Sequence, residues 1–261
     1  MHVGRILLPI FLLVNAFLAM GCAKTTYFTD SIPAAAGRFS AVTSAYPGVV
    51  MVITPSGSGL CTGVMVSQFA VLTATHCVLS PGEYTVRTSL SEFYTSHIER
   101  HGVGDVNDTQ DISLLIFTEP LTPNIADVYS IADRAAVGDA VTVVGFGCNS
   151  IERRTGAGVK REGTNRIAAK TDYLELLTPK PEAARRIIGD SNQAGTCFGD
   201  SGGPMFRQVN PDGLEVAGVT HAGGTFDSYY VSEFTNVADN SGNRDFLARM
   251  NTRYGLGIDG I

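Results

Sequence analysis

The segment Gly199-Asp200-Ser201-Gly202-Gly203-Pro204 sets a serine among glycines and decides how the rest of the chain is interpreted. A serine hydroxyl is a weak nucleophile at neutral pH. Acyl transfer therefore needs an imidazole to take its proton and a carboxylate to hold the imidazole in the right tautomer. Gly199 would let the backbone turn so that its own N–H and that of Ser201 converge on a developing oxyanion. The segment predicts Ser201 as a nucleophile with an oxyanion hole beside it.

Two other segments supply the partners that such a serine needs. His76 directly follows one β-branched run, and Asp111 stands directly before another. Asp105 and Asp108 compete for the role of the carboxylate, but neither of them precedes an apolar strand. We therefore expect a catalytic triad of His76, Asp111 and Ser201.

Composition limits the classes of function. The chain has 261 residues, of which 44% are hydrophobic and 17% charged, so it can bury a core of ordinary size and is not predicted to be disordered. Its formal net charge is −6, and its 19 lysines and arginines are spread thinly. No cluster of them could neutralise a row of phosphates, so we expect no nucleic-acid partner.

The N-terminal residues 1–21 have the pattern of a secretory signal peptide, with a charged start, an apolar stretch and a small residue before Cys22. The ending Leu18-Ala19-Met20-Gly21-Cys22 resembles a bacterial lipobox, which implies cleavage before Cys22 and acylation of that cysteine. Several acyl chains would anchor the protein stably, and Ala23 indicates the outer membrane. Ala19 stands where a lipobox usually has leucine, so an ordinary periplasmic or secreted protein is the alternative.

The cysteines agree with export from the cytoplasm. The chain has five: Cys22, Cys61, Cys77, Cys148 and Cys197. Acylation of the first would leave four to pair, and four cysteines allow three connectivities. None of them forms a C-x-x-C pattern, so we predict no metal site and no cofactor.

Short β-branched runs separated by Gly, Pro, Asn and Asp predict an all-β chain from about residue 48 onward. The expected strands are Val49–Ile53, Val64–Val66, Ala70–Leu72, Ile112–Phe117, Val141–Val144, and a hairpin of Phe206–Val209 with Leu214–Ala217 around Asn210-Pro211-Asp212-Gly213. Helical patterns occur at Glu182–Ile188 and Asn243–Asn251. Residues 22–47 lack periodicity and are predicted to be an N-terminal tether or propeptide.

The three motifs, in the order His, Asp, Ser, resemble those of the trypsin/chymotrypsin family of serine proteases. Thr73-Ala74-Thr75-His76-Cys77 stands for the family's usual T-A-A-H-C, D-I-S-L-L begins at Asp111, and G-D-S-G-G-P is intact. The resemblance implies two packed antiparallel six-stranded β-barrels, over residues 48–135 and 136–261, with a C-terminal helix. It also implies a serine endopeptidase that acts on protein or peptide substrates.

The same resemblance implies a disulfide between Cys61 and Cys77 beside the catalytic histidine, which leaves Cys148 for Cys197. Relatives usually bond the cysteine before G-D-S-G-G-P to one further downstream, but this chain has no cysteine after Cys197.

The residues near the nucleophile constrain which substrate residue the protease cleaves after. In trypsin-like relatives an Asp six residues before the serine selects Lys or Arg, and here that position is Gly195, so trypsin-like cleavage is not expected. Glutamyl endopeptidases of the family have a Thr and a His in places similar to Thr196 and His221, and Gly223 follows in the same expected pocket wall. One extra residue separates Gly218 from His221 relative to those enzymes. The sequence leaves open a pocket for acidic residues and a pocket for small apolar ones.

The sequence leaves two routes to activation open. Family zymogens are cut to free an N-terminal ammonium that pairs with the Asp before the nucleophile, here Asp200. No Ile-Val-like start occurs upstream, and an acylated Cys22 has no free ammonium. Either a second cut, with Arg38 as the simplest site, supplies the ammonium and releases the lipid, or a lysine or arginine satisfies Asp200. The missing motif leaves a second class of function open, a catalytically latent binding lipoprotein with a protease fold.

Overall fold

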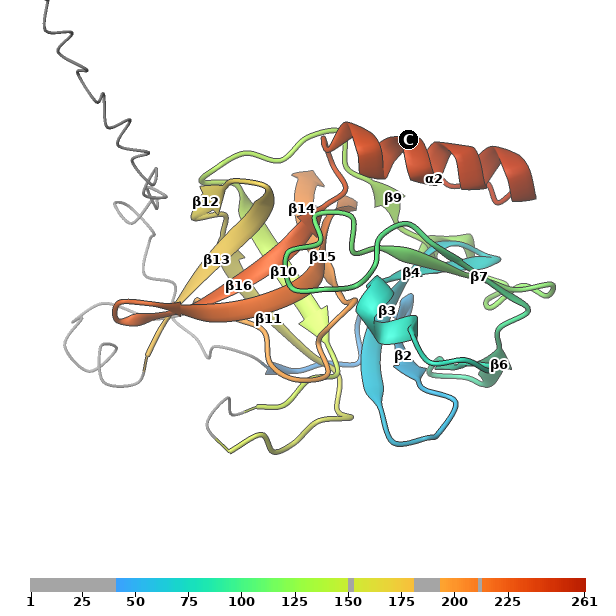
Figure 1. The fold of residues 1–261 in the computed structure, drawn as a ribbon, viewed down its shortest axis with the longest axis horizontal. Coiled ribbons are helices and arrows are strands. Elements are labelled where there is room, and N and C mark those ends of the chain that lie inside the picture. Colours follow the sequence, from blue (N-terminus) through green and yellow to red (C-terminus); the bar gives the residue numbers. More distant parts are fainter. Residues whose placement is uncertain (1–40, 150–152, 181–192, 211–212) are drawn as a thin grey trace, which may run out of the picture.

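The computed structural model describes residues 41–149, 153–180, 193–210 and 213–261, which form two curled β-sheets and one α-helix (Figure 1). Neighbouring strands of the first sheet are antiparallel and follow the order β6-β5-β2-β3-β4-β8-β7. These strands are β2 (Val49–Ile53), β3 (Leu60–Ser67), β4 (Ala70–Thr73), β5 (Thr85–Arg87), β6 (Glu92–Tyr94), β7 (His97–Arg100) and β8 (Ser113–Ile116). β4 and β8 pair with each other and are buried at every position, as their apolar runs require.

The second sheet follows the order β1-β11-β10-β14-β15-β16-β13-β12, also antiparallel, and β9 pairs with β15 in parallel. Its strands are β1 (Ala41–Val42), β9 (Ser130–Ile131), β10 (Ala140–Gly145), β11 (Arg161–Arg166), β12 (Ala169–Lys170), β13 (Tyr173–Pro179), β14 (Pro204–Asn210), β15 (Gly213–Phe226) and β16 (Tyr229–Asn236). Two short 3₁₀ helices, η1 (Thr75–Val78) and η2 (Ile125–Asp127), lie between strands of the first half.

The helix α2 (Ser241–Tyr254) closes the chain and confirms the helix predicted over Asn243–Asn251. The Asn240 side chain caps its start by accepting from the N–H of Asn243, and Gly255 ends it in the left-handed conformation at φ 62°. Leu247 of α2 shares an apolar cluster with Leu72 of the first sheet and Phe206 of the second. This common core holds the two sheets against each other.

The all-β fold class is confirmed, with the two curled sheets and the C-terminal helix that were expected. The described sheets have seven and nine strands rather than six each, because short edge strands extend both of them. Other expectations, the signal peptide over 1–21, Cys22, the helix over Glu182–Ile188 and the turn at Pro211-Asp212, lie outside the described residues.

The last part of the expected tether belongs to the second sheet. Ala41 of β1 pairs with Glu162 of β11, and the Tyr46 ring stacks on Phe206 with 5.9 Å between the ring centroids. A strand of two residues is too short to show a periodic pattern in the sequence, so only the three-dimensional structure reveals that it pairs with β11. Among the described residues, no helix combines the length and the apolar character that crossing a bilayer requires.

Candidate active site

His76 and Asp111 meet where the first sheet ends. η1 follows β4 directly and carries His76, whose Nδ1 lies 2.7 Å from Asp111 Oδ2. The main-chain N–H of His76 also donates to Asp111 Oδ1, at 2.9 Å. The Asp111 side chain is fully buried, whereas 26% of the His76 side chain is exposed, so the imidazole can reach both the carboxylate and a substrate.

The Asp111 carboxylate is ionised at neutral pH. Burial alone would raise its pKa, but hydrogen bonds from His221 and His76 outweigh burial and lower the pKa to about 2. An ionised carboxylate accepts the Nδ1 proton of His76 and leaves Nε2 free to take a proton from a nucleophile.

A threonine that the sequence analysis did not assign joins the two halves of this pair. The hydroxyl of Thr75 donates to the carbonyl of Ile112 at 2.7 Å and lies 2.9 Å from the hydroxyl of Ser113. Through these contacts Thr75 links η1, which carries His76, to the start of β8, which follows Asp111. The only sign of Thr75 in the sequence is that it departs from the usual T-A-A-H-C.

The serine segment is held against the first sheet by Thr62 of β3, which sequence reasoning also missed. The N–H of Thr62 donates to the Ser201 carbonyl at 2.8 Å, and its hydroxyl donates to the Gly199 carbonyl at 2.8 Å. The Ser201 carbonyl also lies 3.5 Å from the sulfur of Cys77, the residue after His76. The structure thus brings the segments of all three predicted triad residues together.

Gly202 is required at this contact. Its φ is 81°, and a Cβ built on it would lie 2.1 Å from the Thr73 hydroxyl and 2.4 Å from the Thr62 carbonyl. No other residue would fit without moving β3 or β4. The glycine therefore allows the second sheet to approach the first at the nucleophile.

Comparison with known proteins agrees with this arrangement. A family model described as Trypsin matches residues 36–240. The chain belongs to the trypsin family. It is a serine endopeptidase with the mainly β fold of that family.

Among solved structures, neuropsin, a serine protease expressed in the limbic system of mouse brain, is similar to this chain. The TM-score is 0.56, the identity is 19%, and the match covers 79% of this chain and 95% of that chain. A likeness at this identity shows the shared fold. No curated protein matches the chain.

The segment expected to form the family's oxyanion hole is fixed through Asp200. One carboxylate oxygen of Asp200 accepts from the N–H of Gly147 at 2.7 Å, and the other from the N–H of Cys197 at 2.8 Å. Gly199 has φ 100°, and a Cβ there would lie 3.1 Å from Gly147 Cα. The backbone at Gly199 and Ser201 is therefore shaped by the contacts of the buried carboxylate between them.

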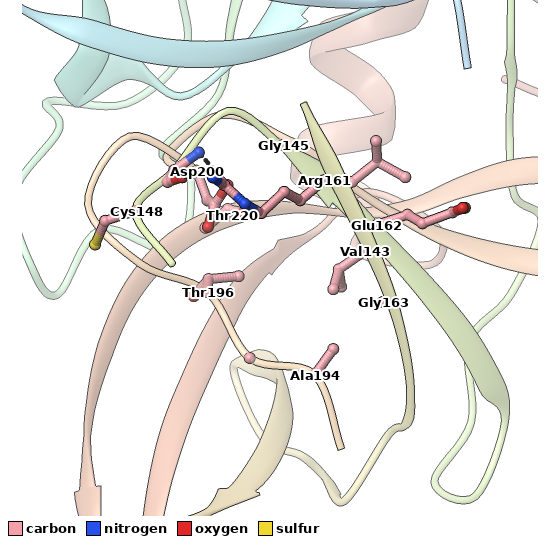
Figure 2. A pocket seen from close by; sticks show the side chains of 13 residues that line it. Val143, Gly145, Cys148, Arg161, Glu162, Gly163, Ala194, Thr196, Asp200 and Thr220 are labelled. Carbon is pink, nitrogen blue, oxygen red and sulfur yellow. Dashed lines mark hydrogen bonds between the residues drawn. The ribbon is translucent and has the colours of Figure 1, made fainter. Parts of the chain in front are cut away.

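A cavity of about 40 Å³ borders Asp200 between β10, β11 and the segment that contains Thr196 (Figure 2). Figure 2 shows the Arg161 side chain extending toward Asp200. Its Nη1 donates to the carbonyls of Gly147 and Gly156, at 3.0 Å and 2.7 Å. Burial raises the pKa of Asp200, and the charge of the guanidinium acts in the opposite direction, although no hydrogen bond joins the two among the described contacts.

Stability should depend on pH through Asp200. Burial raises its pKa from 3.8 to about 6, against the backbone N–H groups of Cys197 and Gly147. Because the folded state then binds the proton more tightly than the unfolded state, ionisation costs stability. We expect the free energy of unfolding of the uncut protein to fall as pH rises from about 4 to about 6, by up to roughly 3 kcal/mol. Urea unfolding across this range measures the slope, which Asp200→Asn should remove. An equal slope in the variant would assign the dependence to other groups.

A second cavity, of about 370 Å³, lies beside Ser201. Thr196 and Gly223, both expected around the substrate, line it. Gly195 instead lines the smaller cavity beside Asp200, where a Cβ would lie 2.4 Å from the Thr178 hydroxyl.

His221 also borders the larger cavity, but its ring nitrogens face away from a substrate. Its Nδ1 lies 2.6 Å from Asp111 Oδ2, and its Nε2 lies 3.3 Å from the Val106 carbonyl. The sequence left open that His221 binds a substrate carboxylate, but both of its ring nitrogens contact protein groups instead. The cause is a β-bulge, since Thr220 pairs with Phe234 and Ala222 with Glu233, which leaves His221 as the unpaired extra residue.

Two groups of side chains in the described residues have the composition of metal ligands. In one, a ring nitrogen each of His76 and His221 and an oxygen of Asp111 lie within 4.8 Å of one another. The Nδ1 atoms of both rings are within hydrogen-bond distance of Asp111 Oδ2, so hydrogen bonds account for the grouping. In the other, Cys61 and Cys77 near His76 are bonded to each other.

Both expected disulfides are present. Cys61 of β3 bonds to Cys77 of η1, and Cys148 bonds to Cys197. The Cys61–Cys77 bond joins the segment after His76 to β3, whose Thr62 contacts the Ser201 carbonyl. The Cys148–Cys197 bond joins the segment of Gly147 to that of Asp200. Structural disulfides are typical of exported proteins.

Proposed function

We propose that this serine endopeptidase cleaves after large, uncharged apolar side chains. The observation that carries the proposal is the cavity of about 370 Å³ beside Ser201, the size of an ordinary ligand pocket. Its described lining contains no Asp, Glu, Lys or Arg. A charged substrate side chain would lose its hydration there without gaining a partner.

The walls of the cavity support the same preference. Tyr230 and Val231 supply apolar surface, and Gly223 and Gly224 add no side chain that would narrow the space. A Cβ built on Gly224 meets nothing within 4 Å. The one imidazole, of His221, is engaged by Asp111 and Val106 and gives an acidic side chain no free N–H.

A peptide library tests this directly, and Gly224→Val tests the pocket. We expect cleavage by the wild type mainly after Phe, Tyr, Leu or Met. The valine would occupy open space, so the fold should persist while kcat/KM for Phe substrates falls at least about tenfold relative to Ala substrates. Reaction with a small fluorophosphonate, which carries no such side chain, should change little and serves as the control. Cleavage mainly after Glu, or after Lys and Arg, would contradict the proposal.

We also propose that the protein is exported as a lipid-anchored zymogen. The lipobox-like segment ending at Cys22 supports the anchor, and a buried Asp200 carboxylate beside a small cavity supports activation by a new ammonium. Ala41 pairs with Glu162, which lines that cavity. A cut after Arg38 would create an N-terminus two residues before Ala41 in the sequence, and the proposal requires its ammonium to reach Asp200.

One set of labelling experiments tests anchor and activation together. In cells, palmitate should label the wild type but not Cys22→Ala, and the cut should release the labelled fragment.

With soluble protein that starts at Ala23, a fluorophosphonate should label Ser201 at least about tenfold faster after limited proteolysis, with the new terminus checked by sequencing. Arg38→Gln should stay at the uncut rate. Equal labelling before and after the cut would mean that the oxyanion hole forms without a new N-terminus and that no zymogen exists.

A further inference from the structure

Two imidazoles share one carboxylate oxygen at the centre of the site. His76 Nδ1 and His221 Nδ1 lie 2.7 Å and 2.6 Å from Asp111 Oδ2, and the two ring centroids are 6.2 Å apart. A triad requires only the first of these rings. The second has no part in the chemistry described so far.

The second ring is held rigidly. The His221 side chain is 2% exposed, and its ring stacks on Tyr173 of β13 with 4.9 Å between centroids and 6° between planes. The bulge in β15 turns it toward Asp111. Its position is therefore set by packing from β13 as well as by the hydrogen bond.

Both nitrogens of His221 face groups that only accept hydrogen bonds. Nδ1 faces the Asp111 carboxylate and Nε2 faces the Val106 carbonyl. A ring that donates from both nitrogens is an imidazolium. Burial alone would lower the pKa of His221, but the hydrogen bond and charge of Asp111, together with Glu233, raise it above its usual range.

Titratable groups approach the ring from both sheets, and Asp108 follows Val106 in the loop that contacts Nε2. Asp111 and His76 approach from the first sheet, and Glu233 lies on β16. Tyr173 on β13 contributes a phenol whose pKa burial raises to about 12, so it is neutral in the working range. The balance is negative, which favours the cation on His221.

We propose that His221 is a positioning residue that holds Asp111 and, as an imidazolium, extends the activity of the protease to lower pH. His76 must be neutral to accept the proton of Ser201. A positive charge on His221 repels a second positive charge on His76, whose ring centroid lies 6.2 Å away. The charge on His221 therefore extends the activity to more acidic solution than Asp111 alone would allow.

The test is the pH dependence of kcat/KM for His221→Gln, measured with a peptide substrate on active protein. Glutamine can still donate to Asp111 but carries no charge. We expect the acid limb to move upward, so that kcat/KM at pH 5, relative to its plateau, falls roughly tenfold. His221→Ala, which also loses the donor, should show the same shift and a lower plateau. The matched control is His97→Gln, a change at an exposed position of β7 beside Glu99, and its acid limb should equal that of the wild type.

A merely structural role would leave the acid limb of both His221 variants in place and change only their stability, and that result would overturn the proposal. If the variants fail to fold, ¹⁵N NMR of the wild type decides the matter. The proposal expects His221 protonated on both nitrogens at pH 7. A neutral His221 at that pH would refute it.

Discussion

Replacing Ser201 with alanine is expected to lower kcat for peptide hydrolysis by about a millionfold while leaving the fold intact. Without the hydroxyl no acyl-enzyme can form, and only the binding and oxyanion contacts remain. The segment is anchored through main-chain atoms, since the Ser201 carbonyl accepts from Thr62 and the Thr62 hydroxyl donates to Gly199. Alanine keeps these contacts. Steady-state kinetics on activated protein, with circular dichroism and Tm beside it, measures both parts.

The matched control for this variant is Ser89→Ala, which makes the same change in an exposed loop between β5 and β6. Its kcat should lie within about twofold of the wild type. A Ser201→Ala enzyme that kept its rate to within tenfold would show that another group is the nucleophile.

Asp111→Asn should be the next most damaging change, with a loss of about 10⁴-fold in kcat. The two oxygens of Asp111 accept three hydrogen bonds, one from the main-chain N–H of His76 and one from each ring, those of His76 and His221. An amide has one acceptor atom and one NH₂ group. If the NH₂ takes the place of Oδ2, the rings of His76 and His221 must change tautomer or move. If it takes the place of Oδ1, it faces the main-chain N–H of His76, which can only donate. Rates at several pH values, with Tm as a check on folding, measure the loss.

Asp105→Asn and Asp108→Asn are the controls, because their positions compete with Asp111 in the sequence. Among the described residues, the side chain of Asp105 accepts only from the N–H of Asn107. The side chain of Asp108 accepts from the N–H groups of Val103 and Gly104 and so shapes the loop that covers His76. We expect Asp105→Asn to have almost no effect and Asp108→Asn an intermediate one. A loss at either site equal to that of Asp111→Asn would contradict the assignment of the triad carboxylate.

Much of the site could be predicted because its chemistry is written in short segments. G-D-S-G-G-P needs glycine at Gly202 to fit against Thr73, and an aspartate heading a buried strand needs a partner such as His76. These requirements act on residues close in sequence, so they leave local patterns. Strands with continuous apolar runs, such as β2, β4 and β10, were predicted for the same reason, whereas β11, β13 and β16 were not predicted.

Residues that act through distant partners left no such pattern. Thr62 lies in an ordinary strand and acquires its role only when Gly199 and Ser201 pack against it. Arg161 lies beside the Asp200 site because β11 pairs with β10, which places Glu162 opposite Val144 and Arg161 opposite Gly145. Neither position differs in the sequence from other threonines and arginines.

By itself the sequence determined the family and the C-terminal helix, because both depend on residue types at fixed local spacing. The same motifs predicted the triad, and the resemblance to the family implied the two disulfide pairings. The tertiary structure alone decided what His221 faces. A single unpaired residue in β15 turns that ring from the substrate cavity to Asp111, since a β-bulge shifts side chains from one face of a strand to the other. Side-chain direction in a sheet follows from its register, and register is set by the pairing of strands far apart in the chain.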